Sequence, residues 1–484
     1  MFEFGKKLAA VLFFASLPLF IPLAYSVAAG DGAWPPILLT IVLLALPAVP
    51  QLTLGIIENI LGIVRKAINP ETPFNYARII GTERIQKEVE VLTLGEILAI
   101  TSLAWLIVPA VTTIPYIYFG VPPLDAFFES MSGWTSTGLS ALTTVSAVPQ
   151  SLLLFRSVTQ WVGGIGIMIL VLSTTRGREA VSFLKAEGRN ETQLGIASTV
   201  RATFGVYLAL TLVFIALASA AGFGLFEAVN LTFSGISNGG FFPFDSHPMS
   251  DMQKLVLAGM MFAGATSVLF FRNVWRGQVE KAVTDEEFLA FAGVTALAVL
   301  LISFGGGGGG LNAVLNAVAA ITGGGFSLGD IPSLGAFGMY VLIILMLLGG
   351  MTGSTTGAIK FWRILVIFKA LARQVREGFM PPGAVQVVKI NNLPINERMI
   401  VESAIFVFAY ILIFLAASGA FMAASYGTED SLFLVATALG NVGLSTVSIP
   451  AVGAAGKVLL IFLMYIGRIE IFPSLALAAL ITRR

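Results

Sequence analysis

The stretch Ser132-Gly-Trp-Thr-Ser-Thr-Gly138-Leu139-Ser140 decides the fold of this chain, because it is one of four related stretches. Each is a run of small or polar residues that ends in a glycine followed by Leu or Phe. Each also follows a short, mildly apolar segment that lies between two longer apolar ones, so the pattern of helix, short segment and helix occurs four times. The other three stretches are Ser234-Gly-Ile-Ser-Asn-Gly-Gly240-Phe241, Ile321-Thr-Gly-Gly-Gly325-Phe326-Ser327 and Ala438-Leu-Gly-Asn-Val-Gly443-Leu444-Ser445.

These glycines predict a backbone that coordinates an ion. Bare backbone at membrane depth is tolerated only where protein buries it or where it lines a water-filled path. An alkali ion that sheds its water needs oxygen ligands, and backbone carbonyls supply them where glycine lets the chain turn them inward. The short helices expected near 123–134, 226–237, 311–321 and 429–440 then aim the negative ends of their dipoles at the ion. Close helix packing, the alternative role for such glycines, explains one loop equally well but not four at corresponding positions.

The composition indicates a membrane protein. Of the 484 residues, 56% are hydrophobic and only 11% are charged, whereas a soluble domain carries roughly 25% charged residues. The net charge of +1 gives no indication of nucleic-acid binding. With no cysteine and a single histidine, the sequence excludes disulfides, thiolate metal sites and histidine clusters.

Ten apolar segments are long enough to span a bilayer, which places both termini on the same side. Of the 28 Lys and Arg residues, 24 fall on that side, and the positive-inside rule identifies it as cytoplasmic. The first segment is expected to be a retained helix of the plasma-membrane protein, and cleavage as a signal peptide is the alternative. The ten segments are 8–29, 35–64, 92–119, 149–173, 198–222, 250–274, 285–304, 334–370, 398–423 and 452–481.

The opposite face carries eight acidic residues in or beside the short segments. An acidic mouth raises the local concentration of cations, and the scarcity of basic residues there favours this interpretation over ordinary loop solvation. The eight residues are Asp125, Glu129, Glu227, Asp245, Asp251, Asp330, Glu429 and Asp430.

The eighth span is interrupted in its middle. The run Leu348-Gly-Gly-Met-Thr-Gly-Ser-Thr-Thr-Gly-Ala358 contains four glycines and four Ser or Thr residues. Such a composition weakens a helix and predicts two helical halves joined by a flexible segment below the loops. A glycine face that only packs against a neighbouring helix is the alternative.

Arg468 lies deep in the last span, where a charge is costly unless it faces protein or water. We expect it to face the pore as an electrostatic barrier. Glu470, two positions away, would point elsewhere on a helix and is not a natural partner. The alternative is an ion pair with a carboxylate of another helix. Lys360, at the end of the interrupted run, is expected to mark the cytoplasmic boundary, and steering of the run is the alternative.

Together these motifs resemble the Trk/Ktr/HKT superfamily of potassium transporters, most closely its TrkH-type membrane subunit. The resemblance covers essentially the whole chain, and the two extra N-terminal helices resemble the TrkH and TrkG branch more than the shorter KtrB. Besides the four stretches it rests on Gln160-Trp-Val-Gly-Gly-Ile-Gly-Ile-Met168, Gly349-Gly-Met-Thr-Gly-Ser-Thr-Thr-Gly-Ala-Ile-Lys360 and Gly467-Arg-Ile-Glu-Ile-Phe472.

The resemblance implies an all-α polytopic membrane protein. Two N-terminal helices would precede four helix–pore-loop–helix repeats arranged around a pseudo-fourfold pore. The corresponding units are an N-terminal pair with its cytoplasmic loop at 1–90 and pore repeats at 91–175, 196–276, 284–370 (with the broken second helix) and 396–484.

The resemblance also assigns the functional residues. K+ would be held at the selectivity filter and nowhere else, with no cofactor, and Gly138 favours potassium because sodium-transporting plant relatives have serine there. The filter residues are Ser136, Thr137, Gly138, Asn238, Gly239, Gly240, Thr322, Gly323, Gly324, Gly325, Asn441, Val442 and Gly443. The gating residues are Gly349, Gly350, Gly353, Ser354, Thr355, Thr356, Gly357, Lys360 and the pore arginine Arg468.

We therefore expect a potassium-selective uptake channel or transporter subunit, not an enzyme, that conducts K+ and Rb+. A less selective K+/Na+ transporter and an ion-coupled symporter of the same fold are the alternatives. A transporter of organic solutes would show paired inverted halves, and an intramembrane enzyme would need clustered acids, bases or metal ligands. The resemblance further implies a homodimer and cytosolic, nucleotide-binding regulatory subunits of the TrkA type, docked on the cytoplasmic loops near 174–197 and 371–397.

Overall fold

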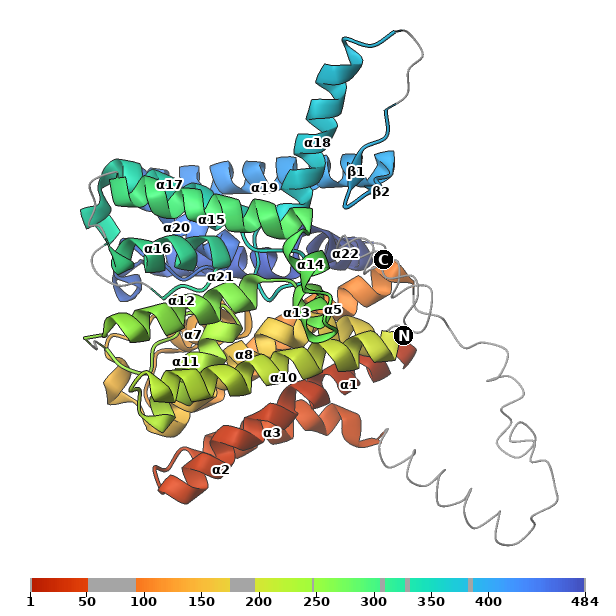
Figure 1. Cartoon of the computed structure of the whole chain (residues 1–484). Coiled ribbons are helices and arrows are strands. Elements are labelled where there is room, and N and C mark those ends of the chain that lie inside the picture. The colour runs from red at the N-terminus through yellow and green to blue at the C-terminus, as the bar shows by residue number, and fades with distance from the viewer. Residues whose placement is uncertain are drawn as a thin grey trace, which may run out of the picture.

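The computed structural model describes residues 2–50, 93–174, 196–245, 248–304, 310–326, 331–381 and 386–482. It is a bundle of helices whose long axes run mostly in one direction, and both termini lie at the same end (Figure 1). The second half of the predicted span 35–64, the loop at 174–197, Ser327 and Asp330 lie wholly or almost wholly outside the described residues.

The first two spans pack against the side of the bundle. α1 (Phe2–Ser16) leads into α2 (Phe20–Ala29) through a 3-10 turn that contains Pro18, which cannot donate to a helical ladder. α3 (Trp34–Ala45) returns along them. Its buried residues share a hydrophobic cluster with Phe155 and Val158 of α8 (Gln150–Thr174), so this pair is docked on the first repeat.

The pattern of long helix, short helix and long helix recurs four times. The first unit has α5 (Leu94–Val111), α6 (Ile114–Tyr118), α7 (Pro123–Trp134) and α8; the second has α10 (Ile196–Ala220), α11 (Leu225–Ile236), α12 (Asp251–Ala265), α13 (Val268–Trp275) and α14 (Val279–Val283). The third has α15 (Glu286–Phe304), α16 (Leu311–Thr322), α17 (Gly335–Leu348) and α18 (Phe361–Glu377); the fourth has α19 (Glu397–Ala423), α20 (Thr428–Gly440), α21 (Ala454–Ile469) and α22 (Ile471–Thr482). A short antiparallel hairpin of β1 (Lys389–Ile390) and β2 (Leu393–Pro394) precedes α19.

The short helices α7, α11, α16 and α20 have only 12 or 13 residues. At 1.5 Å per residue they are about 18 Å long, well short of the roughly 30 Å of hydrocarbon in a bilayer. Their last turns are buried, so each ends inside the bundle and leads into one of the four glycine stretches.

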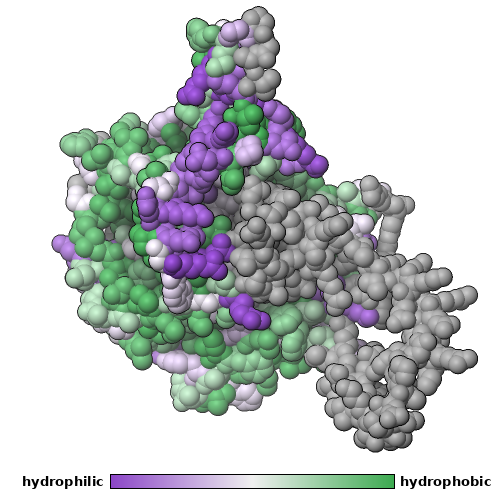
Figure 2. Space-filling view, turned by 45° about the vertical axis from the view of Figure 1, so that its right-hand side comes forward, coloured by the Kyte–Doolittle hydropathy of each residue, from purple (hydrophilic) through white to green (hydrophobic). Residues whose placement is uncertain are grey.

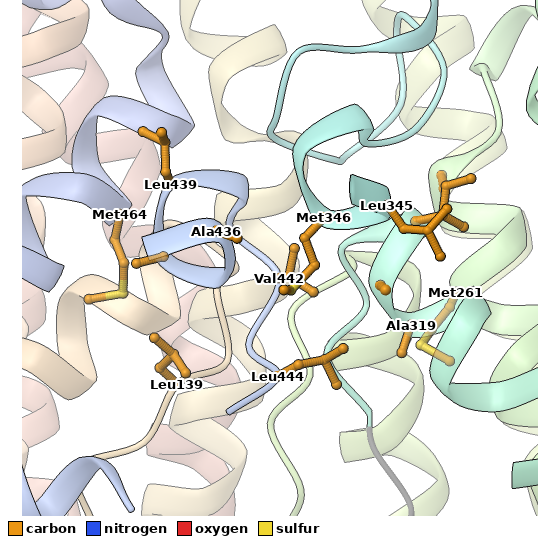
Figure 3. Close-up of a cluster of buried hydrophobic side chains, with 14 of the residues drawn as sticks. Leu139, Met261, Ala319, Leu345, Met346, Ala436, Leu439, Val442, Leu444 and Met464 are labelled. Carbon is orange, nitrogen blue, oxygen red and sulfur yellow. The ribbon is translucent and has the colours of Figure 1, made fainter. Parts of the chain in front are cut away.

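The main hydrophobic core surrounds these stretches. In Figure 3, Leu139, Val442 and Leu444 from the loops lie among side chains of the long and short helices, and all of the labelled side chains belong to one buried cluster. The helical members that the figure labels are Met261, Ala319, Leu345, Met346, Ala436, Leu439 and Met464.

Two predicted spans are bent, and here the prediction of single helices is wrong. The segment 250–274 bends by 98° between α12 and α13, and the segment 452–481 bends by 104° between α21 and α22. Glu470 occupies the second bend with a φ of 66°, so it does not share a helix with Arg468. Both halves of each pair are apolar, and hydropathy alone therefore gives no sign of the break.

The predicted break in the eighth span is confirmed. α17 ends at Leu348 and α18 begins at Phe361, with irregular chain between them. This predicted gating segment, residues 349–360 and called the gating segment below, contains four residues with positive φ: Gly349, Gly353, Ala358 and Lys360. α18 then leaves the bundle sideways (Figure 1) instead of completing a straight span.

The surface agrees with a membrane setting. Among the described residues, six helices are long and apolar enough to cross a bilayer, or up to eight if each bent pair counts as one span. These eight correspond to eight of the ten predicted segments. The other two contain α3 and α8, and their spanning role stays a prediction. Hydrophobic side chains cover the flanks of the bundle, while hydrophilic ones gather on the projecting segment and the end beneath it (Figure 2).

Candidate functional site

The four loops that follow the short helices share one backbone conformation. We name them loop 1 (135–144), loop 2 (237–245), loop 3 (323–326) and loop 4 (441–448). In each, a residue with positive φ is followed two positions later by a glycine with positive φ, the region that glycine adopts most readily. The first residues are Ser136, Asn238, Gly323 and Asn441 (φ 52°, 54°, 70° and 53°), and the glycines are Gly138, Gly240, Gly325 and Gly443 (φ 88°, 76°, 66° and 99°).

These four glycines form a closed ring of contacts. A Cβ atom on Gly138 would lie 2.1 Å from the Gly239 carbonyl oxygen, and one on Gly240 would lie 2.9 Å from that of Gly324. A Cβ atom on Gly325 would lie 2.2 Å from the Val442 oxygen, and one on Gly443 would lie 2.2 Å from the Thr137 oxygen. Loops 1, 2, 3 and 4 therefore touch in cyclic order, and only glycine permits such an approach. The structure thus brings the thirteen predicted filter residues to one place.

Glycines of three long helices bring those helices against the ends of the short ones. A Cβ atom would lie 2.2 Å from the Trp134 oxygen if built on Gly163, and 2.1 Å from the Leu439 oxygen if built on Gly467. A Cβ atom built on Gly264 would likewise lie 2.5 Å from the Ile236 oxygen. The carbonyl ends of α7, α11 and α20 are thus held by close backbone packing.

The residue after each ring glycine anchors its loop in the surrounding core. Leu139, Phe241, Phe326 and Leu444 are all buried. Phe326 of loop 3 also packs on Phe242 of loop 2, with ring centroids 4.7 Å apart. These side chains fix the loops in the surrounding core, while the loop backbones meet one another at the ring.

The gating segment lies against the ends of α11 and α12. Met351 donates its amide hydrogen to the Ala265 carbonyl at 3.0 Å, and the Thr355 amide donates to the Gly264 carbonyl at 3.3 Å. The Thr355 hydroxyl donates to the carbonyls of Gly264 (3.1 Å) and Ile236 (3.2 Å). The bend between α12 and α13 therefore supplies the carbonyls that hold the segment.

The same segment also touches loop 4. A Cβ atom on Gly357 would lie 2.6 Å from Oδ1 of Asn441 and 3.0 Å from the Gly440 oxygen. Among the other predicted gating residues, Gly349 caps the C-terminus of α17, and Gly350 lies against the Ala265 carbonyl. Lys360 donates its amide hydrogen to the Leu348 carbonyl at 2.9 Å. Gly353 has a φ of 78°, and the hydroxyls of Ser354 and Thr356 bind each other at 2.8 Å.

Arg468 is buried and binds backbone carbonyls. One terminal nitrogen donates to the Thr355 oxygen at 2.5 Å, and the other donates to the oxygens of Gly163 (2.5 Å) and Gly164 (2.8 Å). The arginine therefore joins the gating segment to α8, next to the place where Gly163 meets the end of α7.

Sequence reasoning missed the polar contacts that hold the gating segment to its neighbours. Arg363 at the start of α18 binds both carboxylate oxygens of Glu470, at 3.2 and 2.7 Å, and lies 3.9 Å above the Phe406 ring. Glu287 of α15 accepts the Thr352 amide hydrogen at 2.6 Å. The available signal was a charged residue inside or beside an apolar span, which commonly marks a functional position.

The acidic outer face is less free to attract cations than the sequence indicated. Glu129 is fully buried and paired with Arg156, Asp125 is paired with Lys457 at 2.6 Å, and Asp251 is paired with Lys254 at 3.6 Å. The scarcity of nearby bases, on which the prediction rested, therefore does not hold for these three. The missing signal was tertiary, because each basic partner except Lys254 comes from another helix.

Asp245 in loop 2 has a structural role as well. Its carboxylate accepts hydrogen bonds from the Ser146 hydroxyl at 2.6 Å and from the amides of Val145 (2.5 Å) and Ser146 (3.1 Å). These bonds, that of the Ser146 hydroxyl first, hold the pKa of the Asp245 carboxyl below its ordinary value. Asp245 thus ties loop 2 to the residues that directly follow loop 1.

Comparison with known proteins agrees with this geometry. The TrkH family, described as cation transport proteins, matches residues 96–276 and 283–483. An uncharacterized cation transporter of Methanocaldococcus jannaschii is 33% identical over 401 residues, 80% of this chain and 83% of the relative. The Trk system potassium uptake protein TrkH of Escherichia coli is 28% identical over 419 residues, 81% of this chain and 86% of the relative. The crystal structure of the potassium transporter TrkH from Vibrio parahaemolyticus has the same fold, with a TM-score of 0.80 at 23% identity over 98% of this chain and 97% of that one.

Proposed function

Because the chain belongs to the TrkH family of cation transport proteins, we propose that it takes up potassium through a single pore lined by loops 1 to 4. The observation that carries the proposal is the closed ring of four glycines with one repeated backbone conformation. Carbonyl oxygens of the filter residues replace the hydration shell of K+ and Rb+. The carbonyl ends of the four short helices add a favourable negative potential beneath them.

The gating segment and Arg468 close this path on the cytoplasmic side. The Thr355 hydroxyl donates hydrogen bonds to the Ile236 carbonyl at the end of α11 and to the Gly264 carbonyl of α12. The positively charged Arg468 side chain binds the Thr355 carbonyl. A fixed positive charge opposes a cation that descends from the filter. Conduction requires the segment to release these carbonyls and move aside.

The first test is cation flux into liposomes that contain the purified protein, with K+, Rb+, Na+ and Li+ compared. We expect K+ and Rb+ to pass and Na+ and Li+ to be discriminated against. Gly240→Ser and Gly325→Ser should lose this selectivity, because the added side chain would meet the next loop at 2.9 Å and 2.2 Å respectively. Gly240→Ser is the milder change of the two.

A matched control distinguishes the effect of backbone strain from a specific effect of the ring on ion selectivity. Gly222 has a φ of 96° and open space around it, in the turn before α11. Gly222→Ser therefore imposes the same kind of backbone strain away from the ring and should leave the ion preference unchanged. Equal flux of all four ions in the unaltered protein would support the less selective K+/Na+ alternative, and indifferent ring variants would mean that these loops do not select.

The mode of uptake is settled by the same vesicles. We propose a passive, gated pore, for which K+ flux follows the K+ gradient alone. An ion-coupled symporter would instead accumulate K+ when only a proton or sodium gradient is imposed. A proton- or sodium-driven accumulation would contradict the passive pore and leave the pore lining in place.

We also place the protein in the plasma membrane as a homodimer with both termini in the cytoplasm. α18 leaves the bundle sideways and exposes Phe368, Leu371 and Val375, a stripe that favours a protein or lipid partner. Cytosolic nucleotide-binding subunits of the TrkA type are the proposed regulators, acting on the gating segment through α18, which continues it directly. Copurification and mass measurement of the membrane complex test both assemblies.

A further inference from the structure

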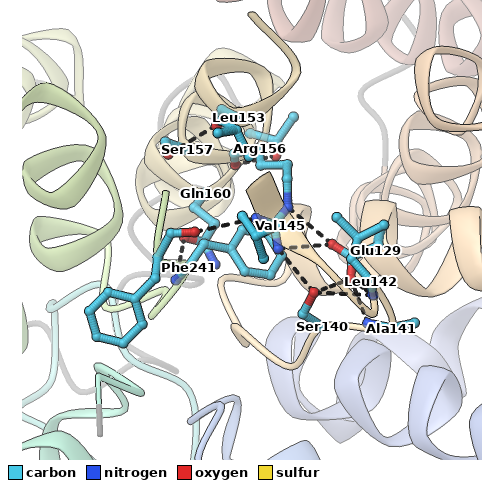
Figure 4. Close-up of polar contacts among 12 residues, drawn as sticks. Glu129, Ser140, Ala141, Leu142, Val145, Leu153, Arg156, Ser157, Gln160 and Phe241 are labelled. Carbon is cyan, nitrogen blue, oxygen red and sulfur yellow. Dashed lines mark hydrogen bonds and ion pairs between the residues drawn. The ribbon is translucent and has the colours of Figure 1, made fainter. Parts of the chain in front are cut away.

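Two buried polar side chains on α8 take no part in the pore as described so far. Arg156 and Gln160 stand one helical turn apart and are 1% and 0% exposed. Both lie among residues of loops 1 and 2 (Figure 4). A buried charge and a buried amide are costly unless they are paired, so their partners indicate their role.

Gln160 holds loop 2 with both ends of its amide. Its Nε2 donates to the Gly239 carbonyl at 2.6 Å, and its Oε1 accepts from the Ser234 hydroxyl at 2.6 Å and from the Phe241 amide at 3.3 Å. Its own backbone carbonyl accepts from the Ser136 hydroxyl of loop 1 at 3.2 Å. A single residue of α8 therefore binds two loops.

The Gly239 carbonyl lies where loops 1 and 2 touch, since it is the oxygen that a Cβ atom on Gly138 would meet. Its counterparts in the ring are the carbonyls of Thr137, Gly324 and Val442. In the part of the chain that the structure describes, no side chain hydrogen-bonds to those three. Among the described residues, loop 2 is thus the one loop whose carbonyl at this layer is bound by a side chain.

Arg156 binds the same two loops one turn toward the outside. It pairs with Glu129 at 3.1 Å and donates to the Ser140 hydroxyl of loop 1 at 3.1 Å. Its guanidinium carbon lies 4.0 Å from the centre of the Phe241 ring, and it donates to the Phe242 carbonyl at 3.5 Å, both in loop 2. Such a cation above an aromatic ring is attracted to it.

Glu129 completes the arrangement from α7. Its Oε1 accepts from the Ser140 hydroxyl at 2.6 Å and from the amides of Ala141 (2.5 Å) and Leu142 (3.2 Å). The carboxylate therefore clamps loop 1 directly after its ring glycine while its other oxygen holds Arg156. Every partner of the two α8 side chains lies in loop 1, in loop 2 or in the short helix that precedes one of them.

We propose that Arg156 and Gln160 are positioning residues that hold loops 1 and 2 at the separation required for K+ selectivity. This inference rests on the proposed filter function of the ring. Neither side chain contacts the ion; each acts through a loop. Without them, the contact between loops 1 and 2 would widen or shift while loops 3 and 4 stay in place.

The decisive measurement is the ratio of K+ to Na+ flux in liposomes, together with the thermal stability of each purified variant. Gln160→Met keeps the length of the side chain and removes both hydrogen-bonding groups. We expect the flux ratio to fall by roughly tenfold, which corresponds to ~1.4 kcal/mol of ion discrimination. Arg156→Lys keeps the charge beside Glu129 but loses the planar fork that reaches Ser140 and Phe242, and should lower the ratio in the same direction.

The control is Asn230, a buried amide that, like Gln160, joins α8 and α11. Asn230 of α11 accepts from the Ser157 hydroxyl of α8 at 2.7 Å and donates to the Phe226 carbonyl at 2.8 Å. Among the residues that the structure describes, its side chain makes no hydrogen bond to a loop. Asn230→Leu should therefore lower thermal stability and leave the flux ratio unchanged. If Gln160 had a merely structural role, Gln160→Met would behave like Asn230→Leu: it would lower thermal stability and leave the flux ratio unchanged.

The outcomes separate this inference from the function on which it rests. If Gly240→Ser alters the flux ratio while Gln160→Met and Arg156→Lys keep it, the ring selects and the positioning role is wrong. If Asn230→Leu shifts the ratio as far as Gln160→Met, the effect is general destabilisation and the role is again wrong. If Gly240→Ser itself is indifferent, the proposed filter fails first. If Gln160→Met does not fold, the ratio for Arg156→Lys decides.

Discussion

Single glycines in this chain allow backbone to meet backbone at two levels of the bundle. At the ring, positive φ and close approach coincide. At Gly163 and Gly467 only close approach matters, since both lie inside helices and face the carbonyl ends of α7 and α20. A methyl group at either position has no flexible neighbour to displace, because the atom it meets is a backbone oxygen.

We therefore expect Gly467→Ala to lower the stability of the purified protein by about 1–3 kcal/mol, the usual cost of overpacking a core. Gly293 of α15 offers a matched control, since nothing lies within 4 Å of a Cβ atom built there. Gly293→Ala should be neutral or stabilising by up to ~1 kcal/mol, because alanine favours a helix. Thermal unfolding in detergent measures both, and equal effects would contradict the close approach.

Asp245 predicts a pH dependence at the same scale. Its pKa is lower in the folded protein than in the unfolded chain, so its hydrogen bonds stabilise the fold above the unfolded pKa of about 3.9 and lose that effect as the pH falls through the folded pKa. Asp245→Asn should therefore be destabilised near neutral pH, and its difference from the unaltered protein should shrink below about pH 4. A difference that grows on acidification would contradict this assignment.

At the scale of elements, Thr355 makes several of the hydrogen bonds that hold the gating segment to the bundle. Thr355 uses its amide and its hydroxyl to bind the end of α12, and its carbonyl accepts from Arg468. The hydroxyl of Ser354, by contrast, binds Met351 and Thr356 within the segment, and no other partner among the described residues. The two residues are neighbours in the chain. Variants of Thr355 and Ser354 therefore distinguish the effect of bonds to the bundle from the effect of bonds within the segment.

Thr355→Val should raise K+ flux. Removing its hydroxyl leaves the segment with fewer bonds to α11 and α12, and a loss of ~1 kcal/mol shifts a closed–open equilibrium by roughly fivefold. Ser354→Ala should raise flux less, since it leaves those anchors intact. Single-channel recording or K+ efflux from vesicles measures the change, and lower flux in Thr355→Val would argue against the segment as a barrier.

At the scale of the whole molecule, both termini share one end of the bundle and the short helices begin toward the other (Figure 1). The chain contains no cysteine, so single cysteines report their side of the membrane without background. Gln374 in α18 and Glu429 at the start of α20 are both exposed.

We expect Gln374→Cys to react with an impermeant thiol reagent only from the cytoplasm and Glu429→Cys only from outside. This result would follow from the distribution of Lys and Arg. Labelling of intact cells and of inverted vesicles makes the comparison. The reversed pattern would overturn the proposed orientation without affecting the ring.

Sequence alone was sufficient for the features that repeat or that concern composition: the membrane class, the four loops, their ring glycines and the break in the eighth span. These follow from local chemistry, because a glycine that must take positive φ or a run of Gly, Ser and Thr in an apolar segment is visible wherever the chain folds. The bends at α12–α13 and at Glu470 were missed because their flanks are apolar on both sides.

Only the tertiary structure decided which polar residues serve which loop. Gln160 was visible within a motif, but its bond to Gly239 joins residues 79 positions apart, and no local pattern specifies such a pair. The same holds for the ion pair of Glu129 with Arg156, since sequence assigned Glu129 to an acidic mouth and its partner comes from another helix. Backbone conformation is a property of neighbouring residues, whereas the partner of a buried charge or amide depends on how distant helices pack.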